Sequence, residues 1–347
     1  MFRTLRRMLF MIPPERAHDL AMAGLDGVVR LGGGRLMPRR IEAPRRLMGL
    51  EFVNPVGLSA GLDKDGDHIG GLAALGFGFL ELGTVTPRAQ PGNPPPRLFR
   101  LPAQAALINR LGFNNQGVEH LCAAVAAVRP RIDIPIGVNI GKNRDTPLER
   151  AGEDYAFCLR AVHGIADYVV INLSSPNTPG LRALQAGREL TALVEALQHE
   201  QSALQAVSGR RVPLVVKIAP DLDDEALAGL VDGLLECGID GITATNTTID
   251  HSAVAGSRHA QEAGGLSGAP LRERATRVVE RIRRQAGPAL PIIAVGGVMS
   301  GADAVAKMQA GADLVQLYTG LIYRGPGLVH EAAAAIRDQT PAAADLS

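Results

Sequence analysis

Eight short apolar runs, each followed by a turn and then by helical periodicity, recur along this chain from about residue 53 onward. They are Val56–Ser59, Phe79–Thr84, Pro135–Ile140, Tyr168–Leu173, Leu214–Ile218, Gly241–Thr245, Ile292–Val295 and Leu314–Tyr318. Apolar strands that alternate with helices are typical of a parallel sheet covered by helices on its outer face. Eight such units predict an α/β fold, the (β/α)₈ TIM barrel, which typically takes about 250 residues. A doubly wound open sheet is the alternative. The count of eight and the lack of a GxGxxG motif after the first run argue against it.

The first 40 residues have a different character and predict a small helical subdomain. Apolar side chains at i, i+3, i+4 and i+7 spacing share one helical face; they are Phe2, Leu5, Met8, Leu9 and Ile12. Arg3, Arg6 and Arg7 are expected off this face. Pro13 and Pro14 interrupt the helix, and Ala17–Val29 predicts a second one. We therefore expect a helical subdomain over residues 1–40 and a catalytic barrel over residues 41–347.

Composition narrows the class of protein. Hydrophobic residues make up 46% of the 347, enough for a large core, and the net charge of +1 gives no field that attracts nucleic acid. Aromatics at 3% and the lack of Trp argue against a base-stacking surface. The three cysteines lie far apart without metal-ligand spacing, and we expect buried thiols and no bound metal. The apolar run Met8–Ile12 is too short for a signal peptide or a transmembrane helix.

Polar residues gather where the predicted strands end, which is where a barrel of this kind carries its active site. They include Lys64, Thr84, Asn139, Lys142, Asn172, Lys217, Thr245 and Asn246. At any single strand such residues are ordinary caps and turns. Their recurrence along the barrel favours a site for a ligand rich in carbonyl and N–H groups. The ends of the predicted strands carry no cluster of His and carboxylate residues suited to hydrolysis or metal binding.

Glycine-rich turns follow the last strands and predict a phosphate site. Gly296-Gly297 precedes a helical pattern, and Tyr318-Thr319-Gly320 does the same after the eighth run. The segment Gly264–Leu271 adds a third close approach of the backbone at Gly268. Barrels often bind a phosphate at the loops after strands 7 and 8, on backbone N–H groups. The pattern alone does not say which cofactor carries the phosphate.

The segment INLSSPNTPG, Ile171–Gly180, is the most unusual of the strand ends, because amides and hydroxyls crowd directly behind a buried strand. Further segments accompany it along the chain: ERAHDLA, AGLDKDG, GNPPPRLFRLP, INRLGFNNQG, GVNIGKN, VKIAPDL, TNTTI, GGLSGAPL and LVQLYTGLIYRGPG. Together they resemble the quinone-dependent, membrane-associated class of dihydroorotate dehydrogenases over nearly the whole chain. Soluble members of that family carry NLSCPN where this sequence has NLSSPN, so Ser175 and the N-terminal extension indicate the quinone-linked class.

The resemblance implies the site residues. It implies that FMN is bound by Ala60, Gly61, Leu62, Asp63, Lys64, Thr84, Asn139, Asn172, Lys217, Thr245, Gly268, Gly297, Tyr318 and Thr319. It implies that dihydroorotate meets Lys64, Asn109, Arg110, Leu111, Gly112, Phe113, Asn172, Asn177, Asn246 and Thr247. Ser175 stands at the position of the family's catalytic base. Asn side chains suit this substrate because amides both donate to and accept from its alternating C=O and N–H groups. Lys217 is expected to favour the reduced flavin, with an ion pair to Asp221 as the alternative.

The resemblance also implies a quinone port between the two N-terminal helices. His18, Arg100 and Tyr318 match family positions at its inner end. It places the protein on the cytoplasmic side of the inner membrane, held peripherally on anionic lipid, in pyrimidine (UMP) biosynthesis. Three alternatives remain at this point: a dihydroorotate dehydrogenase with a soluble acceptor, a barrel lyase or isomerase acting on a sugar phosphate, and a non-catalytic membrane-binding module.

Overall fold

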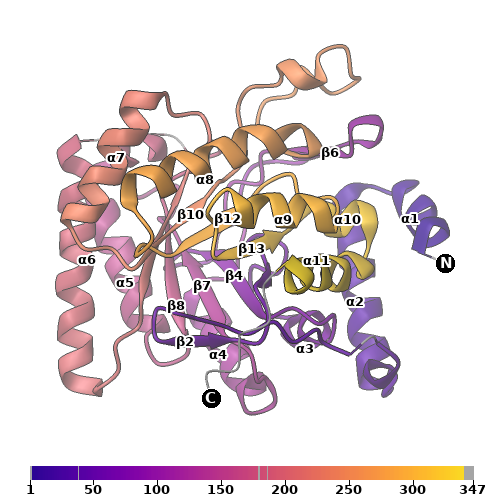
Figure 1. Cartoon of the computed structure of the whole chain (residues 1–347), viewed down its shortest axis with the longest axis horizontal. Helices are drawn as coiled ribbons and strands as arrows, with labels where there is room; N and C mark the ends of the chain where they lie inside the picture. Colours follow the sequence, from indigo (N-terminus) through magenta and orange to yellow (C-terminus); the bar gives the residue numbers. More distant parts are fainter. Residues whose placement is uncertain (1, 38, 179, 186, 340–347) are drawn as a thin grey trace.

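Eight parallel strands close into a barrel in the computed structural model, which describes residues 2–37, 39–178, 180–185 and 187–339 (Figure 1). The barrel strands are β3 (Val56–Leu58), β4 (Phe79–Val85), β7 (Ile136–Ile140), β8 (Tyr168–Asn172), β9 (Leu214–Ile218), β10 (Gly241–Ala244), β12 (Ile292–Val295) and β13 (Leu314–Leu317). They pair in chain order, and β13 closes the barrel on β3. The predicted barrel is confirmed, with strand bounds that differ by no more than a residue at either end.

Helices cover the outside of the barrel. They are α3 (Ile69–Ala73), α4 (Val118–Val128), α5 (Ala151–Val162), α6 (Gly187–Ser208), α7 (Asp224–Glu236), α8 (Arg272–Ala286), α9 (Gly301–Gln309), α10 (Thr319–Arg324) and α11 (Gly327–Gln339). Two begin at side-chain caps: Asp223 accepts from the Ala226 N–H at 2.8 Å, and Ser300 accepts from the Asp303 N–H at 3.1 Å. The buried side chains of α4, α7 and α8 are apolar, and the valine, leucine and isoleucine side chains among them belong to the same core as the barrel strands.

The barrel floor is closed by a short hairpin and by aromatic rings. Strands β1 (Arg45–Leu47) and β2 (Leu50–Phe52) pair antiparallel, and Phe52 meets the Phe79 ring edge-on. A Cβ at Gly57 would lie 2.2 Å from the Phe79 ring, and one at Gly137 would lie 2.1 Å from the Tyr168 ring. Large side chains therefore fill space beside glycines on the paired strands, and the interior is packed. This hairpin was not predicted from the sequence, because each strand has only three residues.

A second, three-stranded antiparallel sheet was also missed. Strands β5 (Leu98–Leu101) and β6 (Ala106–Asn109) leave the barrel after β4, and β11 (Gly265–Gly268) leaves it after β10. The order is β11-β6-β5, with Phe99 and Ile108 in its small core. The prediction of a turn and then a helix after each strand is therefore wrong for β4, where β5 and β6 come before α4, and for β10, where β11 comes before α8. This sheet brings Asn109 and Gly268 to the barrel mouth.

Two N-terminal helices lie at one side of the barrel, near α10 (Figure 1). They are α1 (Phe2–Phe10) and α2 (Pro14–Arg30), so the second starts three residues earlier than expected, with Pro14 in its first turn. Arg6 donates to the carbonyl of Tyr323 in α10 and so links α1 to that helix. Leu5 and Met8 are 48% and 52% exposed, so part of the apolar face is left uncovered.

Two further findings concern the described residues. None of the helices within them is both long and apolar enough to cross a bilayer. The expectation of three buried thiols is met by Cys158, whereas Cys122 and Cys237 are partly exposed.

Candidate active site

A polar cavity opens at the carboxyl ends of the barrel strands, and most of the predicted site residues line it. From the predicted set it is lined by Ala60, Gly61, Lys64, Thr84, Asn109, Leu111, Gly112, Phe113, Asn172, Ser175, Asn177, Lys217, Thr245, Asn246, Thr247, Gly268, Gly297, Tyr318 and Thr319. They come from barrel strand ends and from the three-stranded sheet. Residues that are remote in the sequence therefore meet in one space.

The remaining predicted residues lie behind or beside this cavity. Asp63 is buried, and its carboxylate accepts from the backbone N–H groups of Gly66, Asp67 and His68, so it shapes the loop after β3; burial raises its pKa to about 6. Its neighbour Leu62 is buried in the core and, like Asp63, lines a second cavity. Asn139 is fully buried beneath Thr84, whose hydroxyl donates to it at 2.5 Å. Arg110 turns aside to pair with Glu262 at 2.8 Å.

Ser175 lies in the loop after β8, in the cavity wall. It is 5% exposed, and its Oγ accepts from the Asn177 N–H at 3.2 Å. Tyr155, buried in α5, donates to the Asn172 carbonyl at 2.8 Å and so fixes the end of β8. The Ser175 hydroxyl thus lies in a nearly dry site beside amide groups. A hydroxyl that is to accept a proton from a substrate must be positioned in this way.

Four asparagines near Ser175 form two hydrogen-bonded pairs. Asn177 Nδ2 donates to Asn109 Oδ1 at 3.2 Å, which joins the β8 loop to β6. Asn246 Nδ2 donates to Asn172 Oδ1 at 3.4 Å and to the Ser174 hydroxyl at 2.9 Å. Asn109, Asn177 and Asn246 keep further donor or acceptor capacity, so they can bind a flat ring with alternating carbonyl and N–H groups. The Asn172 amide already donates to Thr84 and Asn139 and accepts from Ser174 and Asn246.

Two of the three lysines near the strand ends face the cavity. Lys64 donates to Asn114 Oδ1 at 3.0 Å; its pKa falls to about 8, mainly through burial and next through the Arg97 charge. Lys217 Nζ lies 3.4 Å from Glu81 Oε1 and 3.3 Å from Ser59 Oγ. The alternative ion pair of Lys217 with Asp221 is wrong, because Asp221 pairs with arginines.

Lys142 turns away from the site. Its Nζ donates to the carbonyls of Asn143 and Thr146 at 3.1 and 2.8 Å. Lys142 therefore stabilises the loop after β7, and it does not line the polar cavity in the part of the chain that the structure describes.

Three turns that contain glycine meet at one end of the cavity, at Gly268, at Gly296-Gly297 and at Thr319-Gly320. Gly268, Gly296 and Gly297 have φ values of +101°, +120° and +77°, which only glycine adopts readily. The hydroxyls of Ser267 and Thr319 lie 2.9 Å apart beside them. Hydroxyls and backbone N–H groups without a carboxylate are the donor set that holds a phosphate monoester, so these turns fit the predicted phosphate site.

A second, apolar cavity of about 680 Å³ lies between the N-terminal helices and the barrel. Its walls include Phe2, Leu9, Met22, Leu25, Leu321 and Ile322. It shares Gly61, Lys64, Leu111 and Tyr318 with the polar cavity. The two cavities therefore adjoin through a wall only one residue thick.

The three predicted quinone-site residues line the apolar cavity. His18 has its pKa lowered to about 4, chiefly by burial and next by the Lys64 charge, so the ring is neutral at pH 7. Arg100 donates to the Ile12 carbonyl at 2.8 Å and lies over the Phe10 ring. Tyr318 donates to the Gly61 carbonyl at 3.3 Å. All three side chains thus bring hydrogen-bond donors to the apolar cavity, and Tyr318 also lines the polar one.

Several residues of the site were not predicted. Ser59, Ser267 and Gln316 line the polar cavity, and Glu81 lies beneath it with 0% exposure. A signal for Glu81 was present, since a single carboxylate interrupts the apolar run Phe79–Val85. A charge at an inward position of a barrel strand requires a buried partner, which here is Lys217.

Comparisons with known proteins identify the family of this chain. The sequence model of the family described as dihydroorotate dehydrogenase matches residues 43–339. A Marinobacter nauticus protein named dihydroorotate dehydrogenase (quinone) is 54% identical over 340 residues, which cover 98% of this chain and 99% of that protein. A Thiobacillus denitrificans protein of the same name is 56% identical over 331 residues, covering 95% and 98%. The crystal structure of DHODH in complex with ferulenol from Eimeria tenella superposes with a TM-score of 0.85 at 39% identity, covering 93% and 90%.

Proposed function

This chain belongs to the quinone-dependent dihydroorotate dehydrogenases, a family of flavin-dependent oxidoreductases, and we propose that it oxidises (S)-dihydroorotate to orotate with FMN as hydride acceptor and a membrane quinone as final electron acceptor. The reaction serves de novo synthesis of pyrimidine nucleotides (UMP). Family membership argues against the sugar-phosphate lyase or isomerase and against a non-catalytic module.

One observation carries the proposal: the polar cavity with Ser175 adjoins the apolar cavity through shared wall residues. A polar ring substrate and a long apolar oxidant cannot share one kind of pocket. Two joined cavities of opposite polarity supply both. The glycine turns and the hydroxyls of Ser267 and Thr319 support FMN, because they suit its phosphate.

The residues that line the polar cavity have separate roles in this reaction. Lys64 attracts the substrate carboxylate, and Asn109, Asn172, Asn177 and Asn246 hold the ring by its C=O and N–H groups. Ser175 Oγ takes the proton from C5 as the C5=C6 double bond forms. Bound FMN supplies the acceptor for the hydride that leaves C6. The substrate thus loses one proton and one hydride, and the electron pair passes on to the quinone, which takes up two protons to become the quinol.

The quinone is proposed to enter between α1 and α2 and to stop near His18, Arg100 and Tyr318. Neutral His18 offers one N–H, and Arg100 and Tyr318 offer further donors to a carbonyl oxygen. Exposed Leu5 and Met8, with Arg3 and Arg7 nearby, form an amphipathic surface suited to the headgroup region of anionic lipid. We propose a peripheral position on the cytoplasmic side of the inner membrane.

An anaerobic absorption experiment tests the proposal. The purified protein is expected to be yellow, to bleach on addition of dihydroorotate, and to regain its colour with a long-tailed quinone. Recolouring by a water-soluble acceptor such as NAD⁺ at a similar rate would favour the soluble-acceptor alternative. A colourless protein, or a flavin that dihydroorotate does not bleach, would refute the proposed activity.

A further inference from the structure

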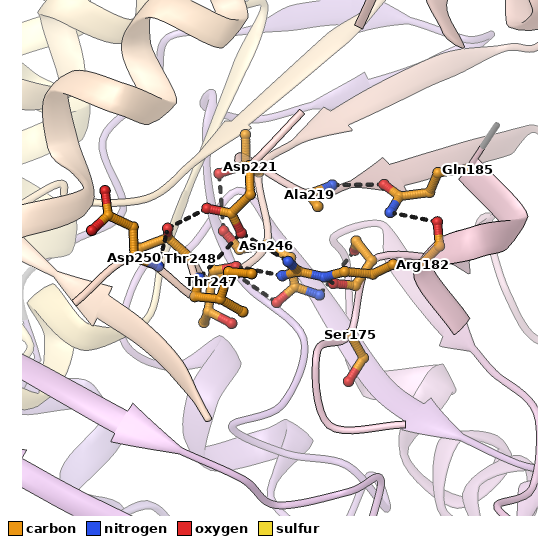
Figure 2. A network of polar contacts seen from close by, with 12 residues as sticks. Ser175, Arg182, Gln185, Ala219, Asp221, Asn246, Thr247, Thr248 and Asp250 are labelled. Carbon is orange, nitrogen blue, oxygen red and sulfur yellow. Dashed lines mark hydrogen bonds and ion pairs between the residues drawn. The ribbon is translucent and has the colours of Figure 1, made fainter. Parts of the chain in front are cut away.

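Arg182 holds three separate loops together behind the catalytic loop (Figure 2). It lies in the 3₁₀ turn η5 (Leu181–Gln185). Its Nε donates to the Ser174 carbonyl at 3.0 Å, and its Nη2 donates to the Thr247 carbonyl at 3.0 Å. Its Nη1 pairs with Asp221 Oδ2 at 2.8 Å. The guanidinium therefore contacts the loops after β8, β9 and β10 at once.

Asp221 completes this junction from the other side. Its side chain is 12% exposed and that of Arg182 is 22% exposed, so both charges are largely removed from water. Its carboxylate accepts from the Thr248 hydroxyl and, at 3.1 Å, from the Ile249 N–H. Arg274 adds a contact to Asp221 at 3.2 Å and pairs with Asp250 at 2.5 Å. The carboxylate thus has partners on both neighbouring loops.

The turn that carries Arg182 is fixed to the barrel at a second point. Gln185 Oε1 accepts from the Ala219 N–H at 2.9 Å, directly after β9. Neither Arg182 nor Asp221 lines the polar cavity within the described residues, whereas their neighbours Ser175 and Thr247 do. The pair therefore acts on the site only through the loops that it connects.

We propose that Arg182 and Asp221 are positioning residues that set the place of Ser175 relative to the substrate held by Asn246 and Thr247. This inference rests on the proposed function. Removal of the C5 proton needs the hydroxyl at hydrogen-bond reach of C5, and a displacement of about 1 Å can cost about 100-fold in rate. Arginine suits the task because its planar fork reaches three acceptors in fixed directions, which lysine does not do.

The alternative is an ion pair that only stabilises the fold. The two explanations differ in what they change. A stabilising pair affects the thermal midpoint and the FMN content, but not the rate constant of flavin reduction in each loaded molecule. A positioning pair changes that rate constant and makes C5–H cleavage more strongly rate-limiting, so the isotope effect of C5-deuterated dihydroorotate rises.

The test uses anaerobic stopped-flow reduction of the full-length holoenzyme by normal and C5-deuterated dihydroorotate. The variants are Arg182→Met, Arg182→Lys and Asp221→Asn, with Arg274→Met as the matched control. Arg274 also pairs with Asp221, yet its guanidinium is bound to Asp221 and Asp250 and not to the catalytic loop. Rates are expressed per bound FMN, and reoxidation by quinone is recorded with the same samples.

Arg182→Met is expected to lower the limiting rate by about 30- to 100-fold and to raise the C5 isotope effect. The limiting rates of Arg182→Lys and Asp221→Asn are expected to lie between those of Arg182→Met and the wild type. These two variants still test the inference if Arg182→Met does not fold. Arg274→Met is expected to stay within about twofold of the wild type, and quinone reoxidation is expected to be unchanged throughout.

Two results would overturn the inference. One is a wild-type rate and isotope effect in the Arg182 variants with only a lower thermal midpoint. The other is an equal loss in Arg274→Met, which would assign the effect to the ion-pair network in general. Failure of dihydroorotate to bleach the wild-type flavin is a separate outcome, and it would overturn the proposed function itself.

Discussion

Lys217 Nζ lies 3.4 Å from Glu81 Oε1 inside the barrel, directly beneath the polar cavity. The Lys217 side chain is 6% exposed and that of Glu81 is fully buried. Glu81 also accepts from Asn139 Nδ2 at 2.8 Å and from Gln316 Nε2 at 2.5 Å. A buried carboxylate is tolerated when donors surround it in this way. The positive charge that Lys217 offers to the cavity is therefore partly offset from below.

Replacement of these two residues is expected to move the flavin midpoint potential in opposite directions. Lys217→Ala removes a positive charge that favours the reduced ring, so the potential becomes more negative and FMN binds more weakly. Glu81→Gln removes the offsetting negative charge, so the potential becomes more positive. Shifts on the order of tens of millivolts are expected for single charges at this range.

Potentiometry of the holoenzymes measures both shifts. Lys142→Met is the control, because Lys142 lies near the end of the neighbouring strand but donates to loop carbonyls. It is expected to keep the wild-type potential. Equal midpoints in Glu81→Gln and wild type would show that the buried carboxylate does not tune the site.

Lys64 predicts a pH dependence of orotate binding. Its pKa of about 8 means that the ammonium is charged below that pH and neutral above it, whereas the orotate carboxylate stays anionic throughout. The dissociation constant of orotate is thus expected to be constant below pH 8 and to rise above it by up to about tenfold per pH unit. Flavin difference spectra at each pH give this constant. Lys64→Met is expected to bind orotate weakly without the bend near pH 8; a bend that persists in this variant would assign the titration to another group.

The exposed face of α1 predicts membrane attachment. Leu5→Glu combined with Met8→Glu places two anions on that face and is expected to abolish sedimentation with anionic liposomes, while dihydroorotate still bleaches the flavin. Deletion of residues 2–30 tests the same helices and is expected to leave bleaching but to remove fast reoxidation by long-tailed quinones. The point variants are cleaner, because α2 is tied to the barrel by the Arg97–Glu15 and His68–Asp26 pairs. Val207→Glu, at a 91% exposed position of α6, is the control. Unchanged liposome binding in the double variant would place the attachment elsewhere.

Sequence reasoning performed best where one physical rule dominates. The buried strands of the barrel are recognisable in the sequence as apolar runs. The rule that the site of such a barrel lies at the carboxyl ends of its strands was enough to predict that Lys64, Asn172 and Asn246 lie close together. The pairing of β6 with β11 was missed because the two strands lie more than 150 residues apart in the chain. A pairing at that separation leaves no local periodicity in the sequence.

Interactions between loops were the least predictable part. Asp221 was considered as a partner for Lys217 because it follows the same strand. Lys217 lies within β9 and contacts Glu81 inside the barrel, whereas Asp221 lies in the loop beyond the strand. Its true partners, Arg182 and Arg274, come from elements 39 and 53 residues away. Glu81 could have been found from its position within an apolar strand, but its contact with Lys217 depends on closure of the barrel.

Single-turnover flavin reduction in Ser175→Ala and Ser175→Cys tests the assignment of the base. A positioned base contributes about 10² to 10⁴ in rate, so Ser175→Ala is expected to lose about that factor with FMN still bound. Ser175→Cys is expected to keep more of the rate, and its pH profile is expected to shift to lower pH, since a thiol ionises more readily than a hydroxyl. An Ala variant that dihydroorotate reduces at the wild-type rate would contradict the role of Ser175 and leave the hydroxyl as a turn cap on the Asn177 N–H.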